Sequence, residues 1–177
     1  ILSFNNFSTI YLADLDSIEE FKKYNSVVKI ILQEYENISF IIDNGARKFS
    51  QLNIYKNNNF KQIIATESFE DYETIIKKNF HNYILSVDIA NDKILHKNEK
   101  YKYLKPSKVI SMNIDSVGRK NGINEKNISY IRQIFPHSDI IISGGIGCNE
   151  DVNRAIGNGF KEIILLTAIL EKKINLI

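Results

Sequence analysis

The chain has 177 residues, of which 44% are hydrophobic and 25% charged, and its formal net charge is +2. This length suits one packed domain over residues 1–177 and is too short for two ordinary ones. The small net charge provides no field for nucleic acid, and no apolar run reaches the ~18 residues that cross a bilayer. We therefore expect neither nucleic acid nor membrane as a partner.

Features of targeting and redox chemistry are few. The one cysteine, Cys148, leaves no internal disulfide and no cysteine-based zinc site, and its place near a helix start would favour a lowered thiol pKa. The N-terminal Ile1-Leu2-Ser3-Phe4 lacks the charged region and cleavage signature of a signal peptide. These features favour a cytoplasmic protein.

Short apolar runs recur along the chain, each rich in Ile, Val or Leu without polar alternation. Such runs are typical of strands buried on both faces, as in a parallel sheet. Each run ends on a polar residue, and the ends follow one another every 22 to 30 residues. In chain order the predicted strands are Thr9–Asp14, Ile38–Asp43, Gln62–Thr66, Tyr83–Asp88, Lys108–Asn113, Asp139–Ser143 and Glu162–Thr167.

Segments of helical length lie between these runs. Apolar residues spaced by three or four predict helices over Ile18–Tyr35, Asn127–Phe135 and Glu150–Ile156. Strands that alternate with helices at regular intervals favour an α/β fold, a (β/α)8 TIM barrel, over an open sheet. In such a barrel the polar strand ends meet on one rim, where catalytic groups lie.

The chain also resembles itself at an offset of about 100 residues. The matching segments are 14–17 with 113–116, 41–46 with 141–146, and 63–66 with 164–167. A half-barrel repeat gives the strand that ends at Asp88 a partner before the first residue. We therefore expect eight strands, with the first βα unit missing from this sequence.

Ser143-Gly144-Gly145 joins a predicted strand to a helix that starts near Asn149. Glycines let the backbone turn sharply and bring its N–H groups against an anion. A phosphate shared with Thr167-Ala168, after the last strand, is a recurring site on this fold. The alternative is an ordinary glycine turn. Because Glu150 stands where a dinucleotide fingerprint needs its third glycine, we expect no nucleotide cofactor.

The repeat places a second candidate site for phosphate or substrate in the first half of the chain. It has one glycine, Gly45, and acidic neighbours, so it binds a weaker or different group, or none. The strand ends expected at the rim beside it are Asp14, Asp43, Thr66 and Asn113.

Asp88 ends a strand opposite both candidate loops and is the expected general acid or base. A carboxylate that only binds loop amides is the alternative. The three histidines lack the spacing of metal ligands, so we expect no metal.

Four segments resemble the HisA/HisF family of histidine-biosynthesis barrels, most closely its divergent archaeal relatives of unassigned function. They are 11–18, 86–88, 143–152 and 167–170. The resemblance implies a bis-phosphorylated ribonucleotide held by two phosphate clamps, and for HisA an Amadori rearrangement without metal or organic cofactor. It also implies that Asp88 is the second catalytic aspartate, whereas Met112 stands where the isomerase has threonine and Asp43-Asn44-Gly45-Ala46-Arg47 replaces the usual GGGIR.

Three functions follow from these features. The favoured one is a cofactor-independent aldose–ketose isomerase acting on a small phosphorylated sugar or ribosyl substrate. The second is a barrel that binds a phosphorylated ligand without catalysis, and the third is the genuine isomerase of histidine biosynthesis. The substrate and the oligomeric state stay open.

Overall fold

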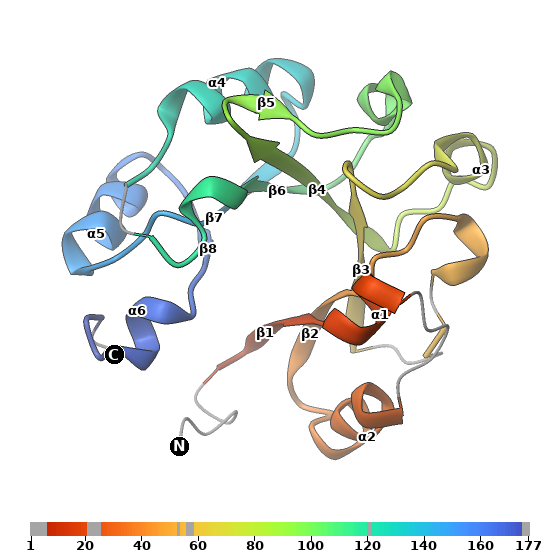
Figure 1. Ribbon diagram of the computed structural model, residues 1–177, viewed down its shortest axis with the longest axis horizontal. Helices are drawn as coiled ribbons and strands as arrows, with labels where there is room; N and C mark the ends of the chain where they lie inside the picture. Colours follow the sequence, from red (N-terminus) through yellow and green to blue (C-terminus); the bar gives the residue numbers. More distant parts are fainter. Residues whose placement is uncertain (1–6, 21–25, 53, 56–58, 120–121, 175–177) are drawn as a thin grey trace. The chain divides into compact units, whose positions relative to one another are not determined.

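The computed structural model describes residues 7–20, 26–52, 54–55, 59–119 and 122–174 (Figure 1). Contacts divide the chain into two compact units. Unit 1 comprises residues 1–84 and 97–104, and unit 2 comprises residues 85–96 and 105–177. Single-domain organisation stays a prediction.

The strands form one sheet, with β5 (Lys93–Ile94) beside β4. Its order is β1 (Thr9–Ala13), β2 (Ser39–Asp43), β3 (Phe60–Ala65), β4 (Tyr83–Ala90), β6 (Lys108–Asn113), β7 (Asp139–Ser143) and β8 (Glu162–Ile164). The pairs β1–β2, β2–β3, β4–β6, β6–β7 and β7–β8 are parallel, and β4–β5 is antiparallel. Parallel strands paired in chain order, with helical crossovers between them, are the arrangement of (β/α)8 barrels. The predicted fold class is confirmed.

Unit 1 has its core between α2 and the first three strands. Val28 and Leu32 of α2 pack on Phe40 and Ile42 of β2, and α2 lies beside β2 in Figure 1. Burying one such side chain stabilises the fold by about 1.5–3 kcal/mol. The elements are β1 (Thr9–Ala13), α1 (Leu15–Glu20), α2 (Ser26–Glu34), β2 (Ser39–Asp43), η2 (Phe49–Gln51), β3 (Phe60–Ala65), α3 (Tyr72–Lys77), η3 (Glu99–Tyr103) and the start of β4 (Tyr83–Ala90).

Unit 2 packs α4 against β6. Ile128 and Ile131 of α4 are buried, and the Asn124 side chain caps this helix by accepting the Asn127 N–H at 3.1 Å. The remaining elements are the rest of β4, β5 (Lys93–Ile94), β6 (Lys108–Asn113), η4 (Ile114–Ser116), α4 (Glu125–Ile134), β7 (Asp139–Ser143), α5 (Asn149–Gly157), β8 (Glu162–Ile164) and α6 (Thr167–Leu170).

The strand registers confirm the half-barrel repeat. Ala13 pairs with Asp43 in unit 1, and Met112 pairs with Ser143 in unit 2, so the equivalent residues lie 99 and 100 positions apart. In the following strands, Gln62 of β3 and Ile163 of β8 occupy equivalent places in the pairing, at an offset of 101 residues.

Several predicted boundaries are wrong for local physical reasons. The helix predicted from Ile18 begins at Leu15, because the Asp14 carboxylate accepts the Ser17 N–H at 3.3 Å and the Ser17 hydroxyl at 2.7 Å and so caps α1. β8 ends at Ile164, and Thr167 starts α6 instead of ending a strand. Residues 21–25 of the predicted helix lie outside the described residues.

β4 also runs past its predicted end at Asp88. It continues to Ala90 and turns back into β5 through Asn91 and Asp92, whose φ angles are +51° and +56°. Two left-handed residues form the tight hairpin turn that Asn and Asp tolerate best. No helix among the described residues is long and apolar enough to span a membrane.

Candidate functional site

One row of residues in unit 2 joins two of the predicted site residues. Asp88 of β4 pairs with Met112 of β6, Met112 pairs with Ser143 of β7, and Ser143 pairs with Ile164 of β8. Residues in register point to the same face of a parallel sheet, so Asp88 and Ser143 share a face about 10 Å apart, two strand spacings. Both are buried.

Asp88 is held by a neighbour on its own strand. The Ser86 hydroxyl donates to Asp88 Oδ1 at 2.7 Å, and Ser86 is 1% exposed. The Asp88 main-chain carbonyl accepts the Leu95 N–H at 2.8 Å, which ties the chain after β5 to this point. The carboxylate therefore has a fixed position at the carboxyl end of its strand.

Packing accounts for both glycines of the Ser143-Gly144-Gly145 loop. Their φ angles are +88° and +89°. A Cβ on Gly144 would lie 2.7 Å from the Asn113 carbonyl oxygen, and one on Gly145 would lie 2.2 Å from that of Gly122. The loop after β7 thus packs directly against the end of β6 at Asn113 and against the chain after β6 at Gly122.

Hydrogen bonds join the same two loops. The Gly145 N–H donates to the Ser116 carbonyl, and the Gly122 N–H donates to the Gly145 carbonyl, both at 3.0 Å. Among the described residues, the N–H groups of Gly144 and Ile146 have no acceptor. Those two amides are the loop's available donors for an anion.

Two further predicted residues, Thr167 and Ala168, open the short helix α6 after β8, and Ala168 is buried. Asn113, in contrast, lines a cavity of about 550 Å³ at the carboxyl end of β6. Ser116 and Gly122, which contact the Gly145 loop, also line this cavity. Unit 2 therefore has space for a ligand beside the loop.

In unit 1 the two predicted aspartates have different roles. Asp14 caps α1, as described above. Asp43, partly buried at the end of β2, accepts the Gly45 N–H at 3.0 Å and the Tyr11 hydroxyl at 3.1 Å. Burial raises the pKa of Asp43, although these two hydrogen bonds act to lower it.

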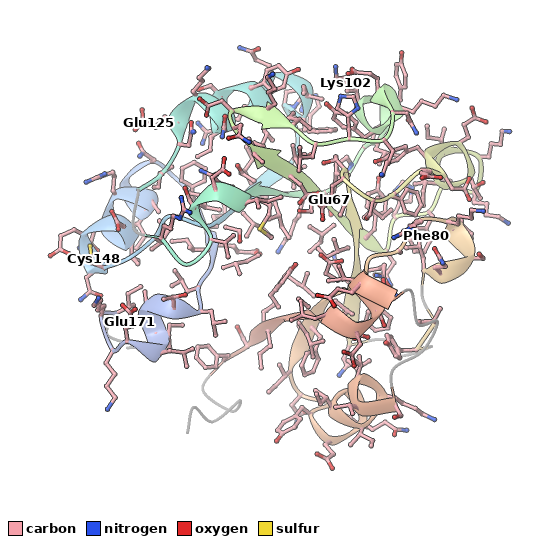
Figure 2. All side chains as sticks on the ribbon, in the orientation of Figure 1. Glu67, Phe80, Lys102, Glu125, Cys148 and Glu171 are labelled. Carbon is pink, nitrogen blue, oxygen red and sulfur yellow. The ribbon has the colours of Figure 1, made fainter. Side chains whose placement is uncertain are left out.

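A cavity of about 230 Å³ lies beside Asp43 and Gly45. Its other charged lining residues are Arg47, Glu67, Glu70 and Lys97. Burial raises the pKa of Glu67, and the negative charge of Asp43 raises it further, against the opposing effect of Lys97. Glu67 follows β3 (Figure 2), next to the fully buried Thr66, whose carbonyl accepts the Lys97 N–H at 3.2 Å.

Cys148 is the residue before α5 (Figure 2), as predicted, but its thiol is not activated. A hydrogen bond with the Glu150 side chain raises the pKa of Cys148, because a neighbouring carboxylate disfavours the thiolate. The expected lowering of the thiol pKa is therefore wrong. Among the described residues, no cluster of His, Cys, Asp or Glu is arranged to hold a metal ion.

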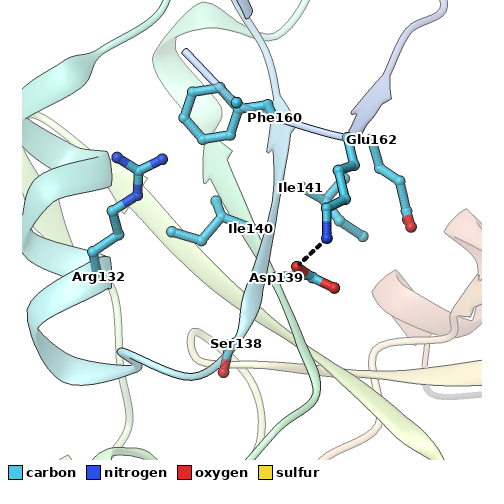
Figure 3. Close-up of a pocket in the computed structure, with 9 residues that line it drawn as sticks. Arg132, Ser138, Asp139, Ile140, Ile141, Phe160 and Glu162 are labelled. Carbon is cyan, nitrogen blue, oxygen red and sulfur yellow. Dashed lines mark hydrogen bonds and ion pairs between the residues drawn. The ribbon is translucent and has the colours of Figure 1, made fainter. Parts of the chain in front are cut away.

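A third cavity lies at the opposite ends of the unit 2 strands. Figure 3 shows Asp139 at the start of β7 and Glu162 at the start of β8, with Arg132 reaching from α4 towards the Phe160 ring. The guanidinium lies 5.1 Å from the ring centroid. This cation–π contact joins α4 to the segment before β8 and lies away from the Ser143 loop.

Three contacting residues were missed from the sequence. Ser86 and Tyr11 each precede an expected site residue on a strand, and alternation of side chains along a strand would have placed Ser86 on the face of Asp88. Lys97 lies 30 residues after Glu67, and no sequence pattern connects them.

Comparisons with known proteins agree with this architecture. A family model described as "Histidine biosynthesis protein" matches residues 2–175. The chain is 24% identical to a 1-(5-phosphoribosyl)-5-((5-phosphoribosylamino)methylideneamino) imidazole-4-carboxamide isomerase of Leuconostoc mesenteroides, over 94% of this chain and 78% of that protein. It is 26% identical to the protein of the same name from Buchnera aphidicola subsp. Schizaphis graminum, over 93% and 76%.

A solved structure with a similar fold is the crystal structure of KGPDC from Streptococcus mutans. The TM-score is 0.61 at 10% sequence identity, and the match covers 94% of this chain and 79% of the other. At this identity the likeness concerns the fold alone.

Proposed function

Since the chain belongs to the histidine biosynthesis protein family, we propose that it is an isomerase that converts a phosphoribosyl-bearing aldose into the corresponding ketose. The small substrate is anchored by a phosphate at the Ser143–Gly145 loop and the start of α6. The names of the relatives support this reaction class. The observation that carries the proposal for this chain is the buried Asp88. Its carboxylate accepts a hydrogen bond from Ser86, and Asp88 lies in the same register row as Ser143.

The reaction needs only proton transfers. A proton given to the ring oxygen opens the aldose ring, and removal of the C2 proton leaves an enol or enolamine. That intermediate takes up a proton at C1 while its C2 hydroxyl gives one up to form the ketone, so the protons balance and no redox partner is consumed. A carboxyl group at a fixed position performs such steps as general acid or base, and we assign one of them to Asp88.

The phosphate end of the substrate would supply orientation. In this proposal the amides of Gly144 and Ile146 donate to the phosphate at the loop, and Thr167 and Ala168 add the first N–H groups of α6. Holding the phosphate there keeps the sugar carbons on the face shared by Asp88 and Ser143. Binding of the unreactive phosphate thereby positions the carbons that react.

The test compares Asp88→Asn with the wild-type chain on the imidazolecarboxamide substrate named for the relatives. We expect kcat to fall at least about 100-fold, the usual effect of losing a general acid or base. Asp139→Asn, at the opposite end of β7, is the matched control and should keep full activity. Full turnover by Asp88→Asn would contradict the assignment.

A second candidate function is ligand binding without catalysis. Met112 favours it, because this apolar residue lies between Asp88 and Ser143 in the row and can transfer no proton. Thermal shifts with phosphosugars and nucleotides, followed by turnover assays on the ligands that stabilise the chain, separate the two functions. Rescue of a histidine auxotroph lacking the isomerase would instead establish the relatives' own reaction.

A further inference from the structure

The loops after β2 and β7 occupy equivalent places in the repeat but differ in charge. Asp43 ends β2 where Ser143 ends β7. Gly45 and Gly145 follow two residues later, with φ angles of +61° and +89°. Gly45 and Gly145 thus share a left-handed conformation, although Gly144 is left-handed and its equivalent Asn44 is not. An acidic residue replaces a neutral one in unit 1.

The Asp43 carboxylate already occupies donors of its own loop. Oδ1 accepts the Gly45 N–H, whereas the equivalent Gly145 N–H donates to a neutral main-chain carbonyl, that of Ser116. Two later donors of this loop, the N–H groups of Arg47 and Lys48, are engaged as well, because Gln51 Oε1 accepts them at 2.8 and 2.9 Å. The loop of unit 1 therefore carries an internal anion where an external one would bind.

The cavity beside this loop is also lined by acidic side chains. Asp43, Glu67 and Glu70 line it together with two cations, Arg47 and Lys97. Burial is the main cause that raises the pKa of Glu67, and the negative charge of Asp43, which lines the same cavity, raises it further. The volume of about 230 Å³ is ample for a phosphate group. Charge, and not size, therefore opposes a phosphate here.

We propose that Asp43 is a specificity-determining residue that closes the unit 1 cavity to phosphate. The loop of unit 2 then holds a phosphate, and the cavity of unit 1 is left to a group that bears none. The assignment of that phosphate to unit 2 rests on the proposed function. The exclusion of phosphate from unit 1 rests on Asp43 and its neighbours alone.

The test follows the backbone amides of Gly45 and Gly144 by NMR while inorganic phosphate is added at pH 8. In the wild-type chain the Gly45 signal should show no saturable shift. In Asp43→Ser, which copies the residue of unit 2, Gly45 should shift saturably, with affinity at least tenfold above any wild-type binding at that position. Asp43→Asn, which keeps an acceptor for the Gly45 N–H and removes the charge, guards against misfolding of the serine variant and should also gain binding.

Glu73→Gln is the matched control, because Glu73 is an acidic residue of unit 1 that pairs with Lys100 and does not line the cavity. It should gain nothing. Saturable binding at wild-type Gly45, or no gain in either Asp43 variant, overturns the inference. Absence of a shift at Gly144 would count against the proposed function only, so the two failures are distinct.

Discussion

The Ser86 hydroxyl and the Asp88 carboxylate, two residues apart on β4, are joined by a hydrogen bond of 2.7 Å between two buried groups. A buried carboxylate that has a donor within its own strand needs no movement of another element to be held in place. The Ser86 hydroxyl therefore helps to fix the position of the Asp88 carboxylate.

Removing this hydroxyl should weaken catalysis without weakening binding. In Ser86→Ala we expect kcat to fall about tenfold, the effect of one lost hydrogen bond of ~1.4 kcal/mol, with little change in KM. Ser111→Ala is the control, because Ser111 is a buried serine on the neighbouring strand that pairs with Val87 and so faces away from Asp88. Steady-state kinetics on both variants check the prediction, and an equal loss in the two would refute it.

Gly145 should tolerate alanine far less well than another left-handed glycine does. Gly145→Ala places a Cβ 2.2 Å from the Gly122 carbonyl oxygen, and we expect it to lower the free energy of unfolding by about 3 kcal/mol. Gly118→Ala, with φ of +72° and no atom within 4 Å, should cost about 1 kcal/mol. Urea unfolding measures both, and similar losses would show that the contact is not the cause.

The raised pKa of Asp43 predicts a stability that declines with rising pH. The folded chain binds this proton more tightly than the unfolded chain does, so the stabilisation is complete below about pH 4 and is lost as the pH passes the raised pKa. Asp43→Asn should therefore be more stable than wild type by about 1 kcal/mol at pH 8 and equal to it near pH 4. Urea unfolding at both pH values would contradict this if the variant were the less stable at pH 8.

Asp71 predicts the opposite dependence within the same unit. Partial burial acts to raise the pKa of Asp71, but hydrogen bonds from the Thr74 side chain and the Phe49 N–H outweigh it, so the pKa is lowered. The resulting stability is present above about pH 4 and is lost as the pH falls through the lowered pKa. We expect Asp71→Asn to cost about 0.5–1 kcal/mol at pH 7 and less in acid. A difference that grows below pH 4 would exclude this account.

The strand order and the repeat could be predicted because each depends on a pattern that the chain repeats. Buried parallel strands need continuous apolar runs, and the equivalent ends at Asp43 and Ser143 recur at a fixed offset. The pair Asn91-Asp92 itself indicates a tight turn, since Asn and Asp tolerate left-handed φ angles. It could have predicted the hairpin that extends β4.

The site was less accessible to sequence reasoning because its contacts cross long stretches of chain. Tyr11 reaches Asp43 from the neighbouring strand, and Lys97 enters the unit 1 cavity from beyond β5. Phosphate chemistry explains why glycines are expected in the loop after β7. The structure adds a second cause, because the backbone of Asn113 and Gly122 lies too close to this loop for a Cβ atom. Only coordinates separate a glycine required by a ligand from one required by a neighbouring backbone.

The contact between Gly145 and Gly122 changes how this loop should be judged in other chains of the family. A glycine that close packing requires would persist in a relative that had stopped binding phosphate, since its replacement would unfold the loop. The buried charge of Asp43, in contrast, lowers the stability of the folded chain. A residue that this chain carries at a cost in stability is therefore a better indicator of ligand preference than a glycine that packing requires.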